Sequence, residues 1–210
     1  MMNTQIIFIE ILDVSTQIPD DLFRLLSTER QERIKRFKFD IDRKLSLYSE
    51  LLVQYRACKE LKILSKEIVF AKNENGKPLL SGYPGFHFNI SHTHNAISIA
   101  FSNSEIGIDI ERIKPPNLEV VKCFSPTEQE YILSHINPKH AFFEIWTKKE
   151  AYLKFTGAGL SIPLKDFSVL DLQIERMIYM FKKNNYFIST CCRDIINTKP
   201  FVVSMTESEL

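Results

Sequence analysis

The 210-residue sequence lacks an apolar run of the ~18–20 residues that a transmembrane helix needs. It also lacks an excess of charge of either sign, because its net charge is only +1. A nucleic-acid or membrane partner held by bulk charge is therefore not expected. The first residues carry no basic region, and Glu10 and Asp13 interrupt the apolar segment that follows. We accordingly expect no secretory signal.

The sequence also lacks the cysteine and histidine spacings that are typical of metal sites and disulfides. None of the four cysteines belongs to a C-x-x-C pair, and two of them, Cys191 and Cys192, are adjacent. Adjacent cysteines rarely bridge one another, so we expect free thiols in the reducing cytoplasm. His92 and His94 lie two residues apart without a cysteine or a further histidine nearby. A zinc site is not expected, because zinc takes three or four protein ligands.

The composition and the order of elements indicate a folded protein with an internal repeat. Apolar residues make up 44% of the chain and charged residues 25%, which are ordinary proportions for a globular protein. A strand, a short capped helix, a long helix and several strands occur twice in succession. The short helices even begin alike, at Ser27-Thr28-Glu29 and at Ser125-Pro126-Thr127-Glu128. This predicts an α+β fold of two similar subdomains, residues 1–103 and 104–210, with a groove between them.

The element boundaries follow from hydrophobic periodicity, which is two residues in strands and three to four in helices. The predicted strands are 5–12, 68–71, 86–90, 97–101, 106–111, 167–172, 177–181, 186–191 and 201–203. Short helices are predicted to begin at residues 27 and 125, and long ones to span 42–62 and 138–155. Residues 73–78 and 91–95 are predicted turns.

The predicted strand 106–111 separates its side chains into two kinds. Its three isoleucines share one face, and Gly107, Asp109 and Glu111 share the other. We interpret Gly107 as leaving the polar face open beside the two acids, which are close enough to lean toward one cation. The alternative is a half-buried strand whose polar face is solvated.

Two helices carry charged residues that allow either a structural or a functional interpretation. Glu150 and Lys154 stand four residues apart on the side of the helix that also carries Trp146, and they either form a surface ion pair or serve a site. The short basic helix contains Arg30 and Arg33, which are either solvated or bind phosphates. Arg43 lies in the first turn of a helix, the unfavourable end for a cation, which suggests another partner. His92 is either an ordinary turn residue or a donor to a phosphate.

Four motifs in order along the chain resemble the 4′-phosphopantetheinyl transferases, in the larger class similar to the surfactin-synthetase activating enzyme. They are G-K-P at 76–78, F-N-I-S-H at 88–92, G-I-D-I-E at 107–111 and W-T-K-K-E-A-Y-L-K at 146–154. The resemblance spans roughly residues 27–164. It implies two α+β halves related by a pseudo-twofold axis, with the site between them. It also implies that 4′-phosphopantetheine moves from coenzyme A to a serine of an apo acyl or peptidyl carrier protein, releasing 3′,5′-ADP.

The resemblance also implies roles for individual residues. Asp109, Glu111 and Glu150 offer only carboxylate oxygens, which favours Mg²⁺, or Mn²⁺ as an alternative, over zinc. Lys154 is expected beside a phosphate or beside Glu150, and Glu150 is expected to take the serine proton, directly or through water. The residues expected to hold coenzyme A are Arg30, Arg33, Arg43, Lys77, Pro78, Ser91, His92 and Lys154.

Two other functions fit parts of the pattern. A metal-dependent nuclease also groups acids around Mg²⁺, but such sites usually add a lysine two residues after an acid, and Ile113 stands there instead. A binding protein that kept the fold and lost the chemistry would not need the intact set of three acids. Because both halves of the expected site lie in one chain, we expect a monomer.

Overall fold

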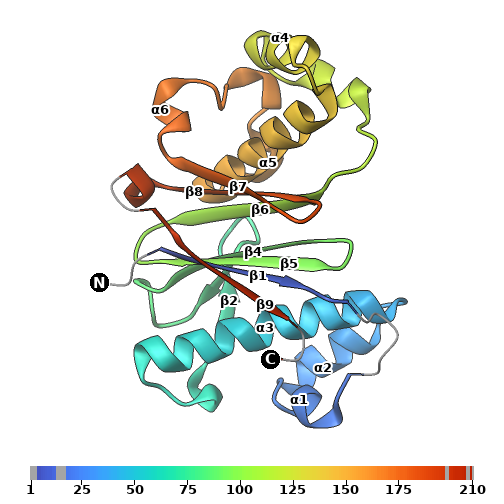
Figure 1. Cartoon of the computed structure of the whole chain (residues 1–210). Coiled ribbons are helices and arrows are strands. Elements are labelled where there is room, and N and C mark those ends of the chain that lie inside the picture. The colour runs from blue at the N-terminus through green and yellow to red at the C-terminus, as the bar shows by residue number, and fades with distance from the viewer. Residues whose placement is uncertain (1–3, 13–17, 197–198, 207–208, 210) are drawn as a thin grey trace.

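Two sheets stacked face to face form the centre of the protein, and one long helix covers each outer face. The computed structural model describes residues 4–12, 18–196, 199–206 and 209. From top to bottom, Figure 1 shows α5, a three-stranded sheet, a four-stranded sheet and α3. The helices are α1 (Asp20–Arg24), α2 (Thr28–Lys35), α3 (Asp40–Leu61), α4 (Pro126–Ser134), α5 (Pro138–Thr156) and α6 (Leu172–Glu175). The strands are β1 (Gln5–Glu10), β2 (Phe70–Lys72), β3 (Pro78–Leu80), β4 (His87–Thr93), β5 (Ala96–Ser102), β6 (Ile106–Arg112), β7 (Ile178–Lys183), β8 (Tyr186–Cys192) and β9 (Phe201–Thr206).

The strand order confirms the internal repeat and the two similar α+β halves. The first sheet has the order β4-β5-β1-β9 and the second the order β6-β8-β7. β1 pairs antiparallel with β5, as β6 pairs antiparallel with β8. The antiparallel pairs β4–β5 and β7–β8 then occupy the same place in each half. β2 and β3 form a separate two-stranded ribbon in the first half.

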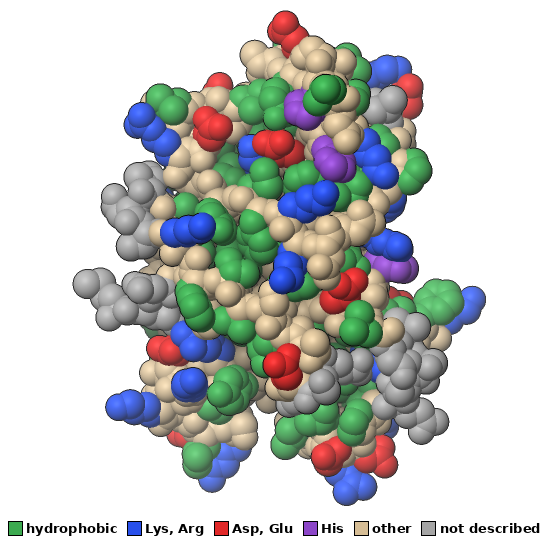
Figure 2. Space-filling model, in the orientation of Figure 1, with side chains coloured by type: hydrophobic (Ala, Val, Ile, Leu, Met, Phe, Trp, Pro, Cys, Tyr) green, Lys and Arg blue, Asp and Glu red, His purple; other side chains and the backbone are tan. Residues whose placement is uncertain are grey.

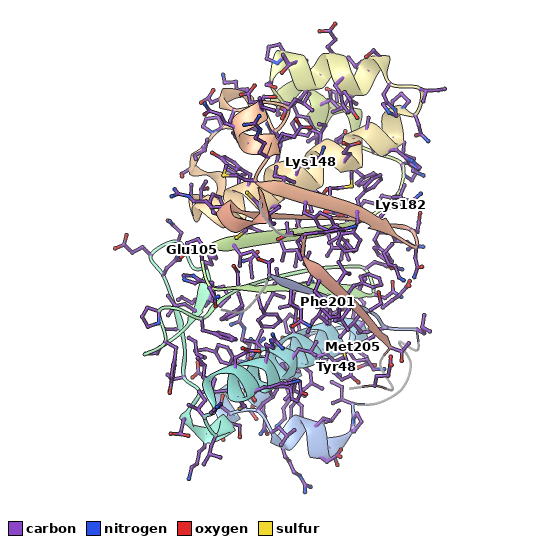
Figure 3. The ribbon with its side chains drawn as sticks, turned by 60° about the vertical axis from the view of Figure 1, so that its left-hand side comes forward. Tyr48, Glu105, Lys148, Lys182, Phe201 and Met205 are labelled. Atoms are coloured by element: carbon purple, nitrogen blue, oxygen red, sulfur yellow. The ribbon has the colours of Figure 1, made fainter. Side chains whose placement is uncertain are left out.

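Alternation along the central strands divides the core into layers, as Figure 3 shows by the side chains that fill the space between them. In β1, Ile7 and Ile9 pack against α3, whereas Ile6 and Phe8 point into the space between the sheets. The isoleucines of β6 meet Ile6 and Phe8 there. A third apolar cluster lies under α4 and α5. The predicted apolar face of β6 is therefore the seam between the halves.

One strand crosses back from the second half to the first sheet. β9 runs parallel to β1 and pairs Phe201 with Gln5. The first sheet thus contains a strand from beyond the predicted boundary at residue 103, which the sequence analysis did not predict.

The structure corrects two of the predicted elements. Residues 167–172 are not a strand; most of them connect a short 3-10 turn to α6. Ser91, His92 and Thr93 belong to β4, so the turn that follows consists of His94 and Asn95 only. The pairing of β4 with β5 extends to Thr93 and Ala96, which leaves room for only a two-residue loop.

One face of the molecule shows how its charges are distributed. On the face shown in Figure 2, acidic, basic and apolar side chains are interspersed. Among the helices of the described residues, none is both long enough and apolar enough to cross a membrane.

Candidate functional site

Strand β6 presents its polar face to helix α5. Trp146 and Lys154 of α5 contact Glu111 and Asp109 of β6 through hydrogen bonds. Asp109 is only 5% exposed. The interpretation of a solvated polar face is therefore wrong, and the two acids lie at an interface between secondary-structure elements.

The sequence suggested that Gly107 leaves the polar face open, and this interpretation is wrong. Gly107 instead allows α5 to approach β6 closely. A Cβ atom at this position would lie 2.1 Å from the Ala151 carbonyl oxygen and 2.3 Å from the Phe155 amide nitrogen. Both contacts are with backbone, which cannot rotate away as a side chain can. Gly107 therefore sets the distance between the strand that carries Asp109 and the helix that carries Lys154.

Asp109 is the centre of a three-residue contact that joins both halves of the protein. Its Oδ1 accepts hydrogen bonds from Lys154 Nζ at 2.7 Å and from Ser91 Oγ, in β4, at 2.9 Å. Lys154 Nζ also donates to Ser91 Oγ at 3.0 Å. Burial raises the pKa of Asp109, while the Lys154 ammonium acts in the opposite direction. The other oxygen, Asp109 Oδ2, is buried and has no hydrogen-bond partner within the described part of the chain.

Glu111 lies next along the same face and is held from both sides. Thr93 Oγ1 donates to Glu111 Oε2 at 3.2 Å, and Trp146 Nε1 donates to Oε1 at 3.4 Å. Trp146 is itself fixed by parallel stacking on Phe142. Burial raises the pKa of Glu111, and the negative charge of Asp109 raises it further.

Glu150, on α5, is the third acid of the set; the other two, Asp109 and Glu111, lie on β6. It is half-buried, and its pKa is raised first by burial and then by the charge of Asp109, with Glu111 adding to the effect. The three carboxylates thus repel one another electrostatically. Lys154, the partner expected for Glu150 in a surface ion pair, directs its ammonium to Asp109 instead. The three predicted acids and Lys154 therefore belong to one site.

The donor chemistry of this site fits a hard divalent cation. It offers carboxylate oxygens, and one of them, Asp109 Oδ2, lacks a partner although buried groups usually have one. Within the described residues, no group of three or more His, Cys, Asp or Glu side chains is arranged so that these side chains alone could hold a metal ion. Mg²⁺ usually binds one or two protein carboxylates and takes its other ligands from water and phosphates. An incomplete protein ligand set is therefore compatible with Mg²⁺.

A buried ion pair that the sequence analysis did not predict joins α5 to α4. Lys149 and Glu128 are both 0% exposed. Lys149 Nζ donates to both carboxylate oxygens of Glu128, at 2.9 and 2.7 Å, and to the Phe167 carbonyl oxygen. Burial lowers the pKa of Lys149, and Glu128 opposes this shift. The only sequence signal was the spacing of Glu128 from Ser125, which forms a capping box at the start of α4.

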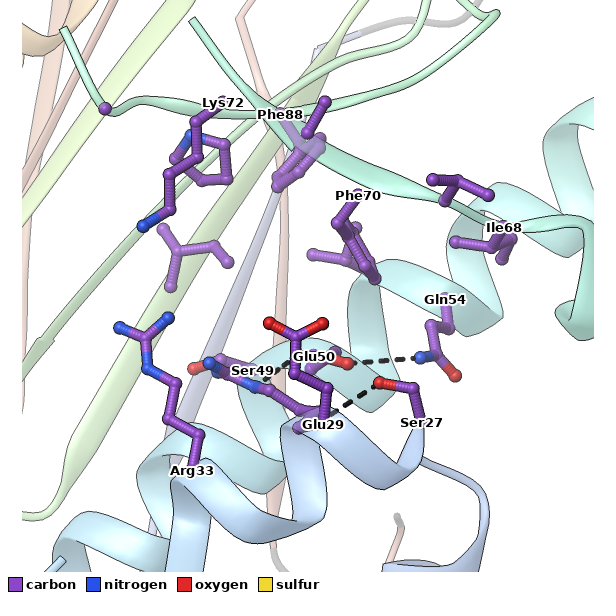
Figure 4. A pocket seen from close by; sticks show the side chains of 17 residues that line it. Ser27, Glu29, Arg33, Ser49, Glu50, Gln54, Ile68, Phe70, Lys72 and Phe88 are labelled. Atoms are coloured by element: carbon purple, nitrogen blue, oxygen red, sulfur yellow. Dashed lines mark hydrogen bonds and ion pairs between the residues drawn. The ribbon is translucent and has the colours of Figure 1, made fainter. Parts of the chain in front are cut away.

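A pocket of about 900 Å³ opens in the first half of the protein, between α2, α3 and the strands β2 to β4. Figure 4 shows Arg33 and Lys72 on one side of it and the rings of Phe70 and Phe88 across the top. Arg30 also lines it, held by Glu50 at 2.5 Å and by Ser46 at 2.8 Å. Cationic groups next to apolar walls suit a ligand with both phosphate groups and a flat ring.

Strand β4 connects the pocket to the carboxylate site. Phe88 and Ile90 line the pocket, whereas Asn89 and Ser91 on the opposite face bond to β6. One strand thus forms the wall of both sites, because its side chains alternate.

The remaining predicted residues lie in different places. Pro78 lines the pocket, and Lys77 Nζ bonds to Glu105 and to the Ile106 carbonyl oxygen instead. Arg43 does have another partner, as expected, since it bonds to the Phe37 carbonyl oxygen and to Asp40. His92 is exposed in β4, and partial loss of water around its ring and the nearby Lys154 charge lower its pKa.

Comparison with known proteins shows to which family the chain belongs. Residues 17–104 match the family described as 4′-phosphopantetheinyl transferase, N-terminal, and residues 105–205 match the 4′-phosphopantetheinyl transferase superfamily. A 4′-phosphopantetheinyl transferase of Bacillus subtilis is 36% identical over 157 residues, which cover 71% of this chain and 68% of that protein. The 4′-phosphopantetheinyl transferase gsp of Aneurinibacillus migulanus is 35% identical over 178 residues, covering 81% and 74%. The human L-aminoadipate-semialdehyde dehydrogenase-phosphopantetheinyl transferase is 28% identical over 186 residues, covering 79% and 59%. The chain belongs to the 4′-phosphopantetheinyl transferase superfamily.

Proposed function

We propose that this transferase uses Asp109, Glu111 and Glu150 to hold Mg²⁺, or Mn²⁺, while 4′-phosphopantetheine passes from coenzyme A to a carrier-protein serine. The observation that carries the proposal is the buried, unpartnered Asp109 Oδ2, which lies among three mutually repelling carboxylates. These carboxylates would hold the cation, and its positive charge would offset that of the coenzyme A pyrophosphate as the serine hydroxyl approaches phosphorus.

The pocket beside β4 is the proposed place for the nucleotide end of coenzyme A. Arg30 and Arg33 supply positive charge for its phosphates, and Pro78 and Phe88 supply apolar contact for the adenine ring. His92, Lys77 and Arg43 are proposed to contact the remaining phosphates. For Lys77 and Arg43, as for Arg30 with Glu50, this requires exchange of their present partners.

The chemical step needs a base and a group that offsets the charge of the leaving phosphate. Glu150 is proposed to take the serine proton, directly or through a water molecule, because its half-buried carboxylate belongs to the same site as Asp109 and Glu111. Lys154 and Ser91, which share a hydrogen bond, are proposed to orient the pyrophosphate. The nucleotide pocket comes from the first half and Glu150 from the second.

We further propose that the acceptor is an apo acyl or peptidyl carrier protein and that the enzyme acts as a cytoplasmic monomer. One chain supplies both the pocket and the acids, so no second copy is needed to complete the site. We place the boundary between the halves at residue 103, between β5 and β6, with β9 as a strand that the second half adds to the first sheet.

The direct test mixes the protein with coenzyme A, Mg²⁺ and an apo carrier protein. We expect the carrier to gain the mass of phosphopantetheine, 3′,5′-ADP to appear, and both products to be lost with EDTA and restored by Mg²⁺. Coenzyme A that binds without either product would support a binding module. Cleavage of DNA in place of transfer would support the nuclease interpretation.

Replacing Lys154 by methionine separates its chemical role from a structural one. The substitution keeps most of the apolar stem and removes the ammonium that contacts Asp109. We expect kcat to fall by about 100-fold or more, because a charge that stabilises the developing phosphate is lost. The melting temperature should change much less than the activity, because Asp109 keeps its bond to Ser91 and the Lys154 side chain is partly exposed. Thermal stability that drops in step with activity would assign the ion pair a structural role.

A further inference from the structure

A tight turn of the first half reaches across to the second half at the end of α5. Residues 73–77 form this turn between β2 and β3. The Asn73 amide donates to the Lys77 carbonyl oxygen at 3.0 Å, and Asn73 Oδ1 accepts from the amides of Asn75 and Lys77 at 3.0 and 2.9 Å. Gly76 supplies the positive φ of 79° that the turn requires. The turn is thus exposed but internally well fixed.

Two side chains of this turn bond to the elements that carry the acids and Lys154. Asn75 Nδ2 donates to the Gly157 carbonyl oxygen at 2.5 Å. Gly157 ends α5 in the left-handed conformation, so this bond satisfies a carbonyl group at the helix C-terminus. Lys77 Nζ donates to the Ile106 carbonyl oxygen and to Glu105, at 2.9 Å each, at the start of β6. Figure 3 labels Glu105 close to the seam between the two sheets.

The same turn borders the nucleotide pocket. That pocket is lined by Lys72 directly before the turn, Gly76 within it and Pro78 directly after it, whereas Asn75 does not line it. A ligand in the pocket therefore touches the turn on one side, while the turn holds α5 on the other.

We propose that Asn75 is a positioning residue that fixes the C-terminal turn of α5, and with it Lys154, relative to the nucleotide pocket. This inference rests on the proposed function. Lys154 lies three residues before Gly157, which is about 4.5 Å along the helix axis. A shift of about 1 Å in a reacting group can cost about 100-fold in rate. The Asn75 bond thus links binding in one half to the chemical groups of the other.

The test compares Asn75→Asp and Asn75→Ala with Glu74→Ala as the matched control. Aspartate keeps the size of asparagine, loses the donor and places a negative charge at a helix C-terminus, where it is unfavourable. Glu74 is the exposed neighbour in the same turn. We expect kcat to fall about tenfold or more in Asn75→Asp and several-fold in Asn75→Ala. Coenzyme A affinity by calorimetry should stay within about twofold, and Glu74→Ala should match the wild type.

Hydrogen exchange supplies a readout that does not depend on transfer. Adding coenzyme A should slow amide exchange in the peptide that spans residues 150–158 of the wild type. This protection should be smaller in Asn75→Asp. Unchanged kcat in both Asn75 variants, or lost affinity with unchanged kcat, would overturn the inference while leaving the transferase function intact. A wild-type protein that binds coenzyme A and modifies no carrier would instead overturn the proposed function.

Discussion

Asp109→Asn is expected to abolish transfer and to leave the fold intact. Asparagine keeps an oxygen that can accept from Ser91 and replaces the unpartnered Oδ2 by an NH₂ group, which cannot bind a cation. We expect kcat/KM to fall by more than about 100-fold, since even residues that only orient metal ligands cost about 10–100-fold when removed. Transfer is measured by mass spectrometry of the carrier protein at saturating coenzyme A.

The controls for Asp109→Asn separate metal binding from charge in general. Binding of Mn²⁺, followed by electron paramagnetic resonance, should weaken in Asp109→Asn and remain in Glu119→Gln, which changes an exposed carboxylate paired with Lys122. Circular dichroism should show the same fold for both variants. Full activity of Asp109→Asn with Mg²⁺ present would rule out the proposed metal ligands.

Gly107→Ala is expected to destabilise the protein more than alanine at any of its other five glycines. The new Cβ would meet backbone atoms of α5 at 2.1 and 2.3 Å, so the strand and helix must separate. Overpacking of this kind costs typically 1–3 kcal/mol, and we expect a loss of about 3 kcal/mol or more because neither neighbour is a movable side chain. The melting temperature should then fall by roughly 6–12 °C.

Gly85→Ala is the matched control for this prediction. A Cβ atom at Gly85 would find no heavy atom within 4 Å, and the residue does not have a positive φ. The control should therefore be neutral or slightly stabilising. Equal stability of the two alanine variants, measured by urea denaturation, would show that α5 does not pack on Gly107.

The sequence predicted those parts of the fold that depend on local periodicity. The long helix predicted at 42–62 spans Asp40–Leu61, and the one predicted at 138–155 spans Pro138–Thr156. Both have strong three- and four-residue apolar spacing and clear ends. The internal repeat could be predicted for the same reason, because it is a repeat in the order of elements and each element was recognised from its local periodicity.

Features that depend on contacts between residues far apart in the sequence could not be predicted. The segment 167–172 alternates like a strand, yet the Phe167 carbonyl accepts from Lys149 and the Val169 amide donates to Glu128. Those bonds hold it as a connection, and one sequence contains no sign of the ion pair that makes them. The role of Gly107 was misread likewise, since only the structure shows what lies opposite a missing side chain.

The candidate site was predictable as a set of residues but not as a network of contacts. The motifs placed Asp109, Glu111, Glu150 and Lys154 together. That Lys154 pairs with Asp109 and not with Glu150 depends on how closely α5 approaches β6, which three-dimensional packing decides.

The pairing of β9 with β1 has a consequence for how the protein folds during synthesis. Gln5 and Phe201 come from opposite ends of the chain and lie opposite each other in the first sheet. Non-local pairing of this kind raises the contact order and slows folding. During synthesis, β1 keeps one edge unpaired until β9 has been made, and exposed edges of this kind invite aggregation. A fragment cut after β5 would keep that edge open, so we expect the first half to be poorly soluble alone and rescued by a peptide that contains β9.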